Sequence, residues 1–145
     1  MLANILLIMN AGVTLFLCGL IWVVQIVHYP LFNLVQPDKY AKFEHEHIRK
    51  ITWIVLVPML LEVFTAILLC VYTPIFIPKG LVIFGVLLVV LIWLSTFLLQ
   101  VPCHHRLKLS FDDSVHRRLV KTNWVRTWLW TARSIIVLYM LFAAM

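Results

Sequence analysis

Four long apolar stretches alternate with short polar segments along this chain of 145 residues. Charged residues are absent from positions 1–37, 80–105 and 134–145, and a single carboxylate, Glu62, interrupts the stretch 51–78. Each stretch reaches the roughly 20 residues that an α-helix needs to cross a hydrocarbon core. The pattern predicts four transmembrane helices, at about 4–27, 51–73, 80–101 and 122–144.

Composition strengthens this prediction and sets the fold class. Hydrophobic residues make up 63% of the chain and charged residues 12%, whereas roughly a quarter of a soluble domain is charged. A soluble core of this size could not bury so much apolar surface, so lipid must act as the solvent. The first stretch lacks the basic n-region and the small-residue cleavage site of a signal peptide, so we expect it to remain as a helix. The sequence therefore predicts one all-α domain, an integral membrane four-helix bundle.

Basic residues gather on one side of this predicted bundle. Four spans place both termini and the turn 74–79 on one side, and the connections 28–50 and 102–121 on the other. Nine of the twelve lysines and arginines lie in these two long connections, and a tenth, Arg126, lies close to the second of them. By the positive-inside rule, the long connections are cytoplasmic and the termini lie outside, as in a bacterial inner-membrane protein. The net charge of +6 is then explained by anionic lipid headgroups. The lipid bilayer is the expected partner, nucleic acid is not, and four short spans are compatible with a homo-oligomer.

The two halves of the chain share a spacing. The string His-x4-Lys-x2-Trp begins at His45 and again at His116, an offset of 71 that also carries Glu62 onto Arg133. A duplicated helical hairpin and a coincidence both explain this match. Glu62 and Arg133 fall near the bilayer midplane, where a lone charge costs about 2.5–3.5 kcal/mol or more. We therefore expect a buried ion pair that locks the second helix against the fourth; a proton or ion relay is the alternative.

Histidines and carboxylates on the predicted cytoplasmic side suggest a metal site. Imidazole suits zinc, copper and iron, and Glu44-x-x-His47 has the spacing that di-iron bundles direct inward. The alternative is that interfacial histidines simply contact headgroups. The sequence predicts a centre that holds iron, copper or zinc, or haem b, from a set of seven residues: His28, Glu44, His45, His47, His104, His105 and His116.

Several short strings carry a resemblance. Pro102-Cys103-His104 and Thr122-Asn123-Trp124 are the most specific, and Val27-His28-Tyr29-Pro30 accompanies them. With these strings the chain resembles, over nearly its whole length, a group of uncharacterised small bacterial membrane proteins. That resemblance implies four transmembrane helices and no established activity. In size and helix count the chain is also loosely similar to the anthrone-oxygenase-like membrane family, from which no motif carries over.

One further residue points to a ligand. Arg126 lies one heptad before Arg133 on the same helix face, and we predict that it binds an anionic headgroup or a lipid-soluble, quinone-like small molecule. The leading hypothesis is a metal- or haem-dependent oxidoreductase that acts on a hydrophobic substrate at the cytoplasmic face. A non-catalytic scaffold or assembly protein and a small transporter subunit are the alternatives. The chain has no CxxC pair and only four glycines, which disfavours thiol redox chemistry and nucleotide-binding loops.

Overall fold

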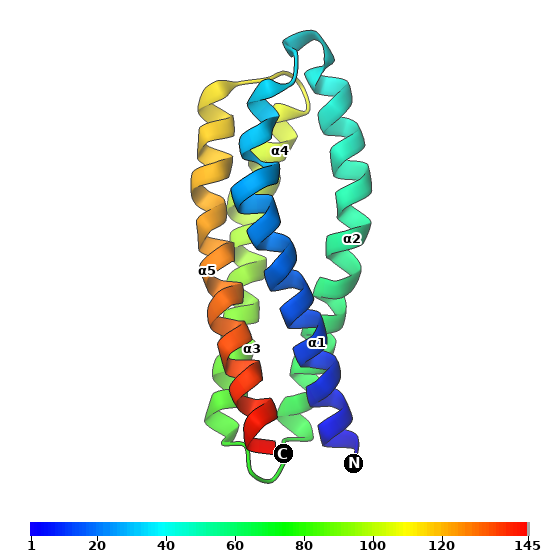
Figure 1. The fold of residues 1–145 in the computed structure, drawn as a ribbon, viewed down its shortest axis with the longest axis vertical. Coiled ribbons are helices and arrows are strands. Elements are labelled where there is room, and N and C mark those ends of the chain that lie inside the picture. The colour runs from blue at the N-terminus through cyan, green and yellow to red at the C-terminus, as the bar shows by residue number, and fades with distance from the viewer. Residues whose placement is uncertain (145) are drawn as a thin grey trace.

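The computed structural model describes residues 1–144 and is an all-α four-helix bundle. Four antiparallel rods run the length of the molecule (Figure 1), and each is long and apolar enough to cross a membrane. The rods consist of the following elements in chain order: α1 (Leu2–Val23), the π-helical turn η1 (Val24–His28) and the 3₁₀ turn η2 (Pro30–Leu34); α2 (Pro37–Val71); α3 (Lys79–Ser95), the π-helical turn η3 (Thr96–Gln100) and α4 (Val101–Leu107); and α5 (Asp113–Ala144).

Both termini lie at one end of the bundle, together with the turn between α2 and α3 (Figure 1). The opposite end carries the histidines and is called the histidine end below. The helices extend further there than the predicted spans, so that at this end only Tyr29 and residues 35–36 and 108–112 lie outside helical structure. Hydropathy marks where the lipid ends, and polar residues can continue a helix beyond it.

The start of α5 shows how the helices end at this side. Asp112 Oδ1 accepts hydrogen bonds from the Ser114 hydroxyl at 2.6 Å and from the amide N–H groups of Ser114 and Val115 at 2.8 and 3.2 Å. These contacts satisfy amide groups that have no partner within the helix. The Ser114 hydroxyl, followed by the Val115 amide, holds the pKa of the Asp112 carboxyl below its ordinary value.

The rods form a square in cross-section. Helix α1 packs against α2 and α5, and α3 packs against the same two helices, so α1–α3 and α2–α5 are the diagonal pairs. The outer surface is apolar, with Phe64 and Phe142 both largely exposed. The interior instead buries polar side chains, including Asn10 and Thr65. This reversal of the soluble-protein pattern is expected where lipid surrounds the bundle and polar contacts join the helices.

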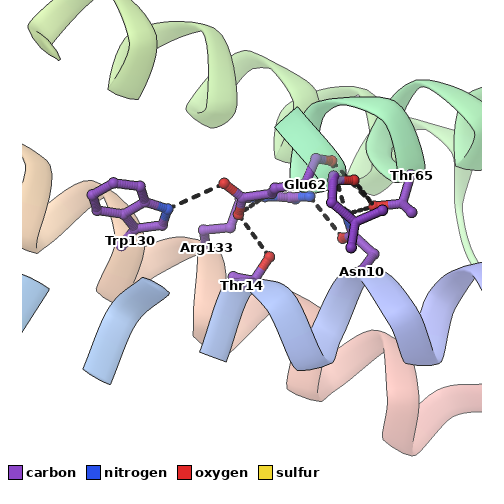
Figure 2. A network of polar contacts seen from close by, with 7 residues as sticks. Asn10, Thr14, Glu62, Thr65, Trp130 and Arg133 are labelled. Carbon is purple, nitrogen blue, oxygen red and sulfur yellow. Dashed lines mark hydrogen bonds and ion pairs between the residues drawn. The ribbon is translucent and has the colours of Figure 1, made fainter. Parts of the chain in front are cut away.

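A polar network crosses the centre of the square (Figure 2). Glu62 Oε1 accepts a hydrogen bond from the Thr14 hydroxyl at 2.7 Å and lies 3.5 Å from Arg133 Nε, and Glu62 Oε2 accepts one from Trp130 Nε1 at 3.1 Å. Arg133 Nη2 donates to Asn10 Oδ1 at 2.8 Å. Glu62 and Arg133 therefore form an ion pair across the α2–α5 diagonal, with exposed fractions of 0% and 2%.

Gly85 leaves room for this network. A Cβ atom at Gly85 would collide with Arg133 Nη1, whereas a Cβ atom at Gly12, Gly19 or Gly80 would meet nothing within 4 Å. The guanidinium of Arg133 thus occupies the space that a side chain on α3 would otherwise take.

The two π-helical turns interrupt the first and third rods near the histidine end. The Tyr29 amide donates to the Val24 carbonyl at 2.9 Å, and the Val101 amide donates to the Thr96 carbonyl. The turns start 72 residues apart, at Val24 and Thr96, close to the offset of 71 between the halves. Duplication nevertheless stays a prediction, since His45 is exposed and its counterpart His116 is buried.

Candidate functional site

A chain of hydrogen bonds joins three ionisable side chains at the histidine end. The Nδ1 atom of His104 lies 2.6 Å from Glu44 Oε1, and its Nε2 atom lies 2.9 Å from the Tyr29 hydroxyl. A neutral His104 with its proton on Nδ1 satisfies both contacts, because it donates to the carboxylate and accepts from the phenol. Glu44 is fully buried on α2 and Tyr29 is 4% exposed. A carboxylate that orients an imidazole against a hydroxyl is a general acid–base arrangement.

Two further histidines lie beside this chain. His28 Nε2 and His47 Nδ1 are 3.0 Å apart, and the rings of His47 and His104 have centroids 5.6 Å apart. His47 Nε2 and Glu44 Oε2 are buried without a hydrogen-bond partner among the described residues. Within residues 1–144, no group of three or more His, Cys, Asp or Glu side chains is positioned to hold a metal ion.

The remaining predicted ligands lie apart from this cluster. His45 and His105 are exposed and point away from the bundle interior. His116 is buried, but its Nε2 atom donates to the backbone carbonyl of Tyr29 at 2.8 Å and so fixes the segment that follows η1. The structure thus brings together Glu44, His28, His47 and His104, and it does not bring His45 or His105 to them.

A cavity of about 260 Å³ lies below this cluster, between α2 and the α3–η3–α4 rod. Its outer rim includes residues exposed on the membrane-facing surface, such as Thr52 and Phe97, so the cavity opens sideways toward lipid. Its upper end is formed by Tyr29 and His104, and its lower end by apolar side chains that include Met59. The acid–base chain therefore reaches an apolar space that opens to the bilayer.

Arg126 lines the same cavity and differs from Arg133 in its surroundings. It is 5% exposed, and no Asp or Glu carboxylate lies within ion-pair distance of it among the described residues. Its Nη1 atom donates to Asn123 Oδ1 at 3.3 Å, its guanidinium carbon lies 5.1 Å from the Trp130 ring centroid, and its Nε atom has no partner among residues 1–144. A buried cation is thus held by neutral groups.

A relay of amides fixes the position of Arg126. Gln25 Oε1 accepts a hydrogen bond from Asn123 Nδ2 at 2.9 Å, and Gln25 Nε2 donates to the Val120 carbonyl at 3.2 Å. Asn123 in turn presents its oxygen to Arg126. Gln25 belongs to η1, so the π-helical turn of the first rod helps to orient a cation on the fourth. Such turns occur frequently at functional sites.

Sequence reasoning missed parts of this site. Tyr29 stands beside His28 in the sequence, but no residue pattern around it indicates a role in a site. Trp93 lines the cavity, and its indole N–H is buried without a partner among the described residues. An aromatic residue inside an apolar helix gives no signal that its side chain lines a cavity.

The fold and the site define an integral membrane four-helix bundle with a lipid-facing cavity next to a histidine–carboxylate cluster. Comparison with models of known protein families, with curated proteins and with solved structures finds no match.

Proposed function

We propose that this protein is a membrane-embedded enzyme that takes a lipid-soluble substrate from the bilayer and transfers protons to and from it. The observation that carries the proposal is the continuity between the cavity and the chain Tyr29–His104–Glu44, since two of the three residues line the cavity. Proton transfer by a positioned side chain accelerates reactions by about 10²–10⁴-fold. No other set of hydrogen-bonded ionisable groups within residues 1–144 reaches this space.

The step has a simple proton balance. The Tyr29 hydroxyl gives its proton to one position of the substrate, His104 Nε2 receives a proton from another position and returns it to Tyr29, and Glu44 balances the imidazolium that forms. No electron is gained or lost, and the reaction class is proton transfer next to a carbonyl group, as in an isomerisation. Between turnovers the Tyr29 and His104 protons exchange with solvent, so that deuterium from D₂O reaches the substrate.

Deuterium incorporation tests the proposal without knowledge of the substrate. The purified full chain in lipid nanodiscs is incubated in D₂O with a total lipid extract of the host membrane, and the lipids are analysed by mass spectrometry. We expect at least one species to gain deuterium at a stable C–H position with the wild-type protein, and none with Tyr29→Phe or His104→Gln. His105→Gln is the matched control, because His105 is the exposed neighbour of His104. Labelling that is absent in the wild type, or unchanged in Tyr29→Phe, overturns the proposal and favours a non-catalytic scaffold.

A second candidate is the metal-dependent oxidoreductase that the sequence suggests. The observation that favours it is the pair of buried, unpartnered atoms His47 Nε2 and Glu44 Oε2. Because residues 1–144 hold no preformed group of three ligands, side chains would have to reorient on binding.

Elemental analysis and an optical spectrum of the purified protein separate these two candidates. The oxidoreductase proposal expects iron, copper or zinc near one atom per chain, lost in His47→Ala and retained in His45→Ala, whose side chain is exposed. Protein that contains no metal after growth in metal-supplemented medium, and binds none afterwards, contradicts it.

The proposed setting is the bacterial inner membrane with the histidine end in the cytoplasm and both termini outside. The support is the charge bias, since nine of the twelve basic residues lie in the two connections at the histidine end and Arg126 lies close to them. Alkaline phosphatase fused to the C-terminus should be active in this orientation, and a cytoplasmic reporter fused there should be inactive. The reverse result would place the histidine end outside.

A further inference from the structure

Two residues that line the cavity carry buried hydrogen-bond donors without a partner within residues 1–144. Arg126 Nε and Trp93 Nε1 are both buried without a partner among the described residues, and both side chains line the cavity. One acceptor among the residues that line the cavity, Gln100 Oε1, already accepts a hydrogen bond from the Ser95 hydroxyl at 3.3 Å. A buried donor without a partner costs about 1–3 kcal/mol, and a charged one costs more. The cavity therefore favours a ligand that brings acceptor atoms.

Charge narrows the class of ligand. Arg126 is a permanently charged guanidinium, 5% exposed, with no carboxylate at ion-pair distance among residues 1–144. The comparable cation Arg133 has Glu62 at 3.5 Å. Since a buried arginine is normally paired with an anion, the site lacks one negative charge, and the ligand is expected to supply it.

The shape of the cavity indicates how the ligand lies. Arg126 is seven residues, or about 10 Å along the helix, from Arg133 toward the histidine end. Below Arg126 the cavity is lined by apolar residues such as Leu17, Ile21 and Met59, and above it by Tyr29 and His104. A polar group placed at Arg126 would therefore extend its apolar part toward the bilayer centre, in the same direction as the lipids of that leaflet.

We propose that the ligand of this cavity is an anionic amphiphile, whose oxyanion binds Arg126 and the Trp93 indole N–H and whose apolar chain lies between α2 and α3. This inference names the substrate class of the proposed enzyme and rests on the same cavity. The oxyanion is a carboxylate or enolate on a single apolar chain, or the phosphate of a membrane lipid. Its position next to the Tyr29–His104 pair places the polar end of the ligand where protons are exchanged.

A binding experiment tests this inference separately from catalysis. The full chain in a non-ionic maltoside detergent is titrated with dodecanoate, dodecanol or methyl dodecanoate, and in a further arm with phosphatidylglycerol or phosphatidylcholine, while thermal unfolding is followed by circular dichroism. A ligand that binds only the folded state raises the midpoint temperature. We expect dodecanoate to stabilise the protein with at least tenfold higher apparent affinity than the alcohol or the ester. Stabilisation by phosphatidylglycerol alone, lost in Arg126→Gln, assigns the oxyanion to a phospholipid phosphate.

Variants locate the effect at the cavity. Arg126→Gln should weaken binding at least tenfold, whereas Arg118→Gln, an exposed arginine on the same helix, should leave it unchanged at the same net charge. If Arg126→Gln does not fold, Arg126→Lys serves instead; it keeps the charge, loses the planar fork, and should bind more weakly while still preferring the acid. Equal binding of alcohol and acid, or binding unaffected by Arg126 substitution, overturns the inference. Wild-type protein that binds dodecanoate through Arg126 but incorporates no deuterium into any lipid rejects the proposed reaction alone.

Discussion

Breaking the Glu62–Arg133 pair should destabilise this protein far more than breaking a shorter pair on its surface. Glu62→Gln keeps the shape of the side chain, but it replaces one carboxylate oxygen with an NH₂ donor and leaves Arg133 without an anion. Glu62 accepts hydrogen bonds from Thr14 at 2.7 Å and Trp130 at 3.1 Å, and one of them is lost. Removing one partner of a buried pair costs about 3–5 kcal/mol, and we expect a loss in this range.

The control is an ion pair that is shorter than the Glu62–Arg133 pair but exposed to solvent. Glu46 and Arg49 are only 2.7 Å apart, closer than the 3.5 Å between Glu62 and Arg133, but their side chains are 42% and 63% exposed. Exposed pairs contribute about 0–1 kcal/mol because water screens them. Glu46→Gln should therefore change the free energy of unfolding far less than Glu62→Gln does.

Reversible unfolding in mixed detergent and SDS micelles, followed by far-ultraviolet circular dichroism, measures both changes. A double-mutant cycle with Glu62→Gln and Arg133→Met isolates the pair. We expect the double variant to be more stable than the sum of the single losses implies, with a coupling near the upper part of the about 0.5–3 kcal/mol seen for contacting residues. Additive losses, or a Glu62→Gln effect no larger than that of Glu46→Gln, would refute the reasoning that burial makes this pair matter.

Three further outcomes follow from the geometry. Gly85→Ala should lower the stability measured by the same unfolding assay, because its Cβ would displace the Arg133 guanidinium. The control is Gly19→Ala, whose Cβ would meet nothing within 4 Å, and it should be neutral or stabilising by up to about 1 kcal/mol. Arg126→Met should leave ligand-free protein at least as stable as wild type in that assay, because no anion is left unpaired; a loss as large as that of Arg133→Met would contradict this. The pKa of Asp112 is held below its ordinary value. The stability that its carboxylate contributes is therefore present above about pH 4 and is lost as the pH falls below that value. When the unfolding midpoint is measured between pH 3 and 7, it should depend less on pH in Asp112→Asn than in the wild type.

The sequence predicts the fold of this protein more completely than it predicts the candidate site. Apolar stretches of spanning length gave the four-helix membrane bundle, because lipid selects for hydrophobicity over a fixed thickness. The offset between the halves brought Glu62 and Arg133 to equal depth, and the structure has them 3.5 Å apart. Helix ends were predicted less well, since nothing in hydropathy records that α2 continues from position 51 back to Pro37.

The candidate site was only partly accessible from the sequence. Residue type and helical spacing favoured Glu44 and His47, both of which are buried, but residue type alone also included His45 and His105, which are exposed. Where a helix extends beyond the membrane, its apolar periodicity is weak. Residue type alone does not then indicate which side of the helix packs against a neighbouring helix. Tyr29 was missed for a different reason: its direction depends on the π-helical turn η1, which no residue pattern in the chain announces.

Because the cavity opens sideways, the affinity of this protein for a ligand depends on how much of that ligand is dissolved in the membrane. A molecule that enters through the rim near Thr52 and Phe97 comes from the leaflet, so the relevant concentration is its mole fraction in lipid. Each methylene that it carries adds about 0.8 kcal/mol to membrane partitioning, before any contact with the protein is made. Ligands with longer apolar chains should thus saturate the protein at a lower total concentration, even if the cavity itself binds them no more tightly. Adding inert lipid, which lowers their mole fraction in the membrane, should reverse that difference.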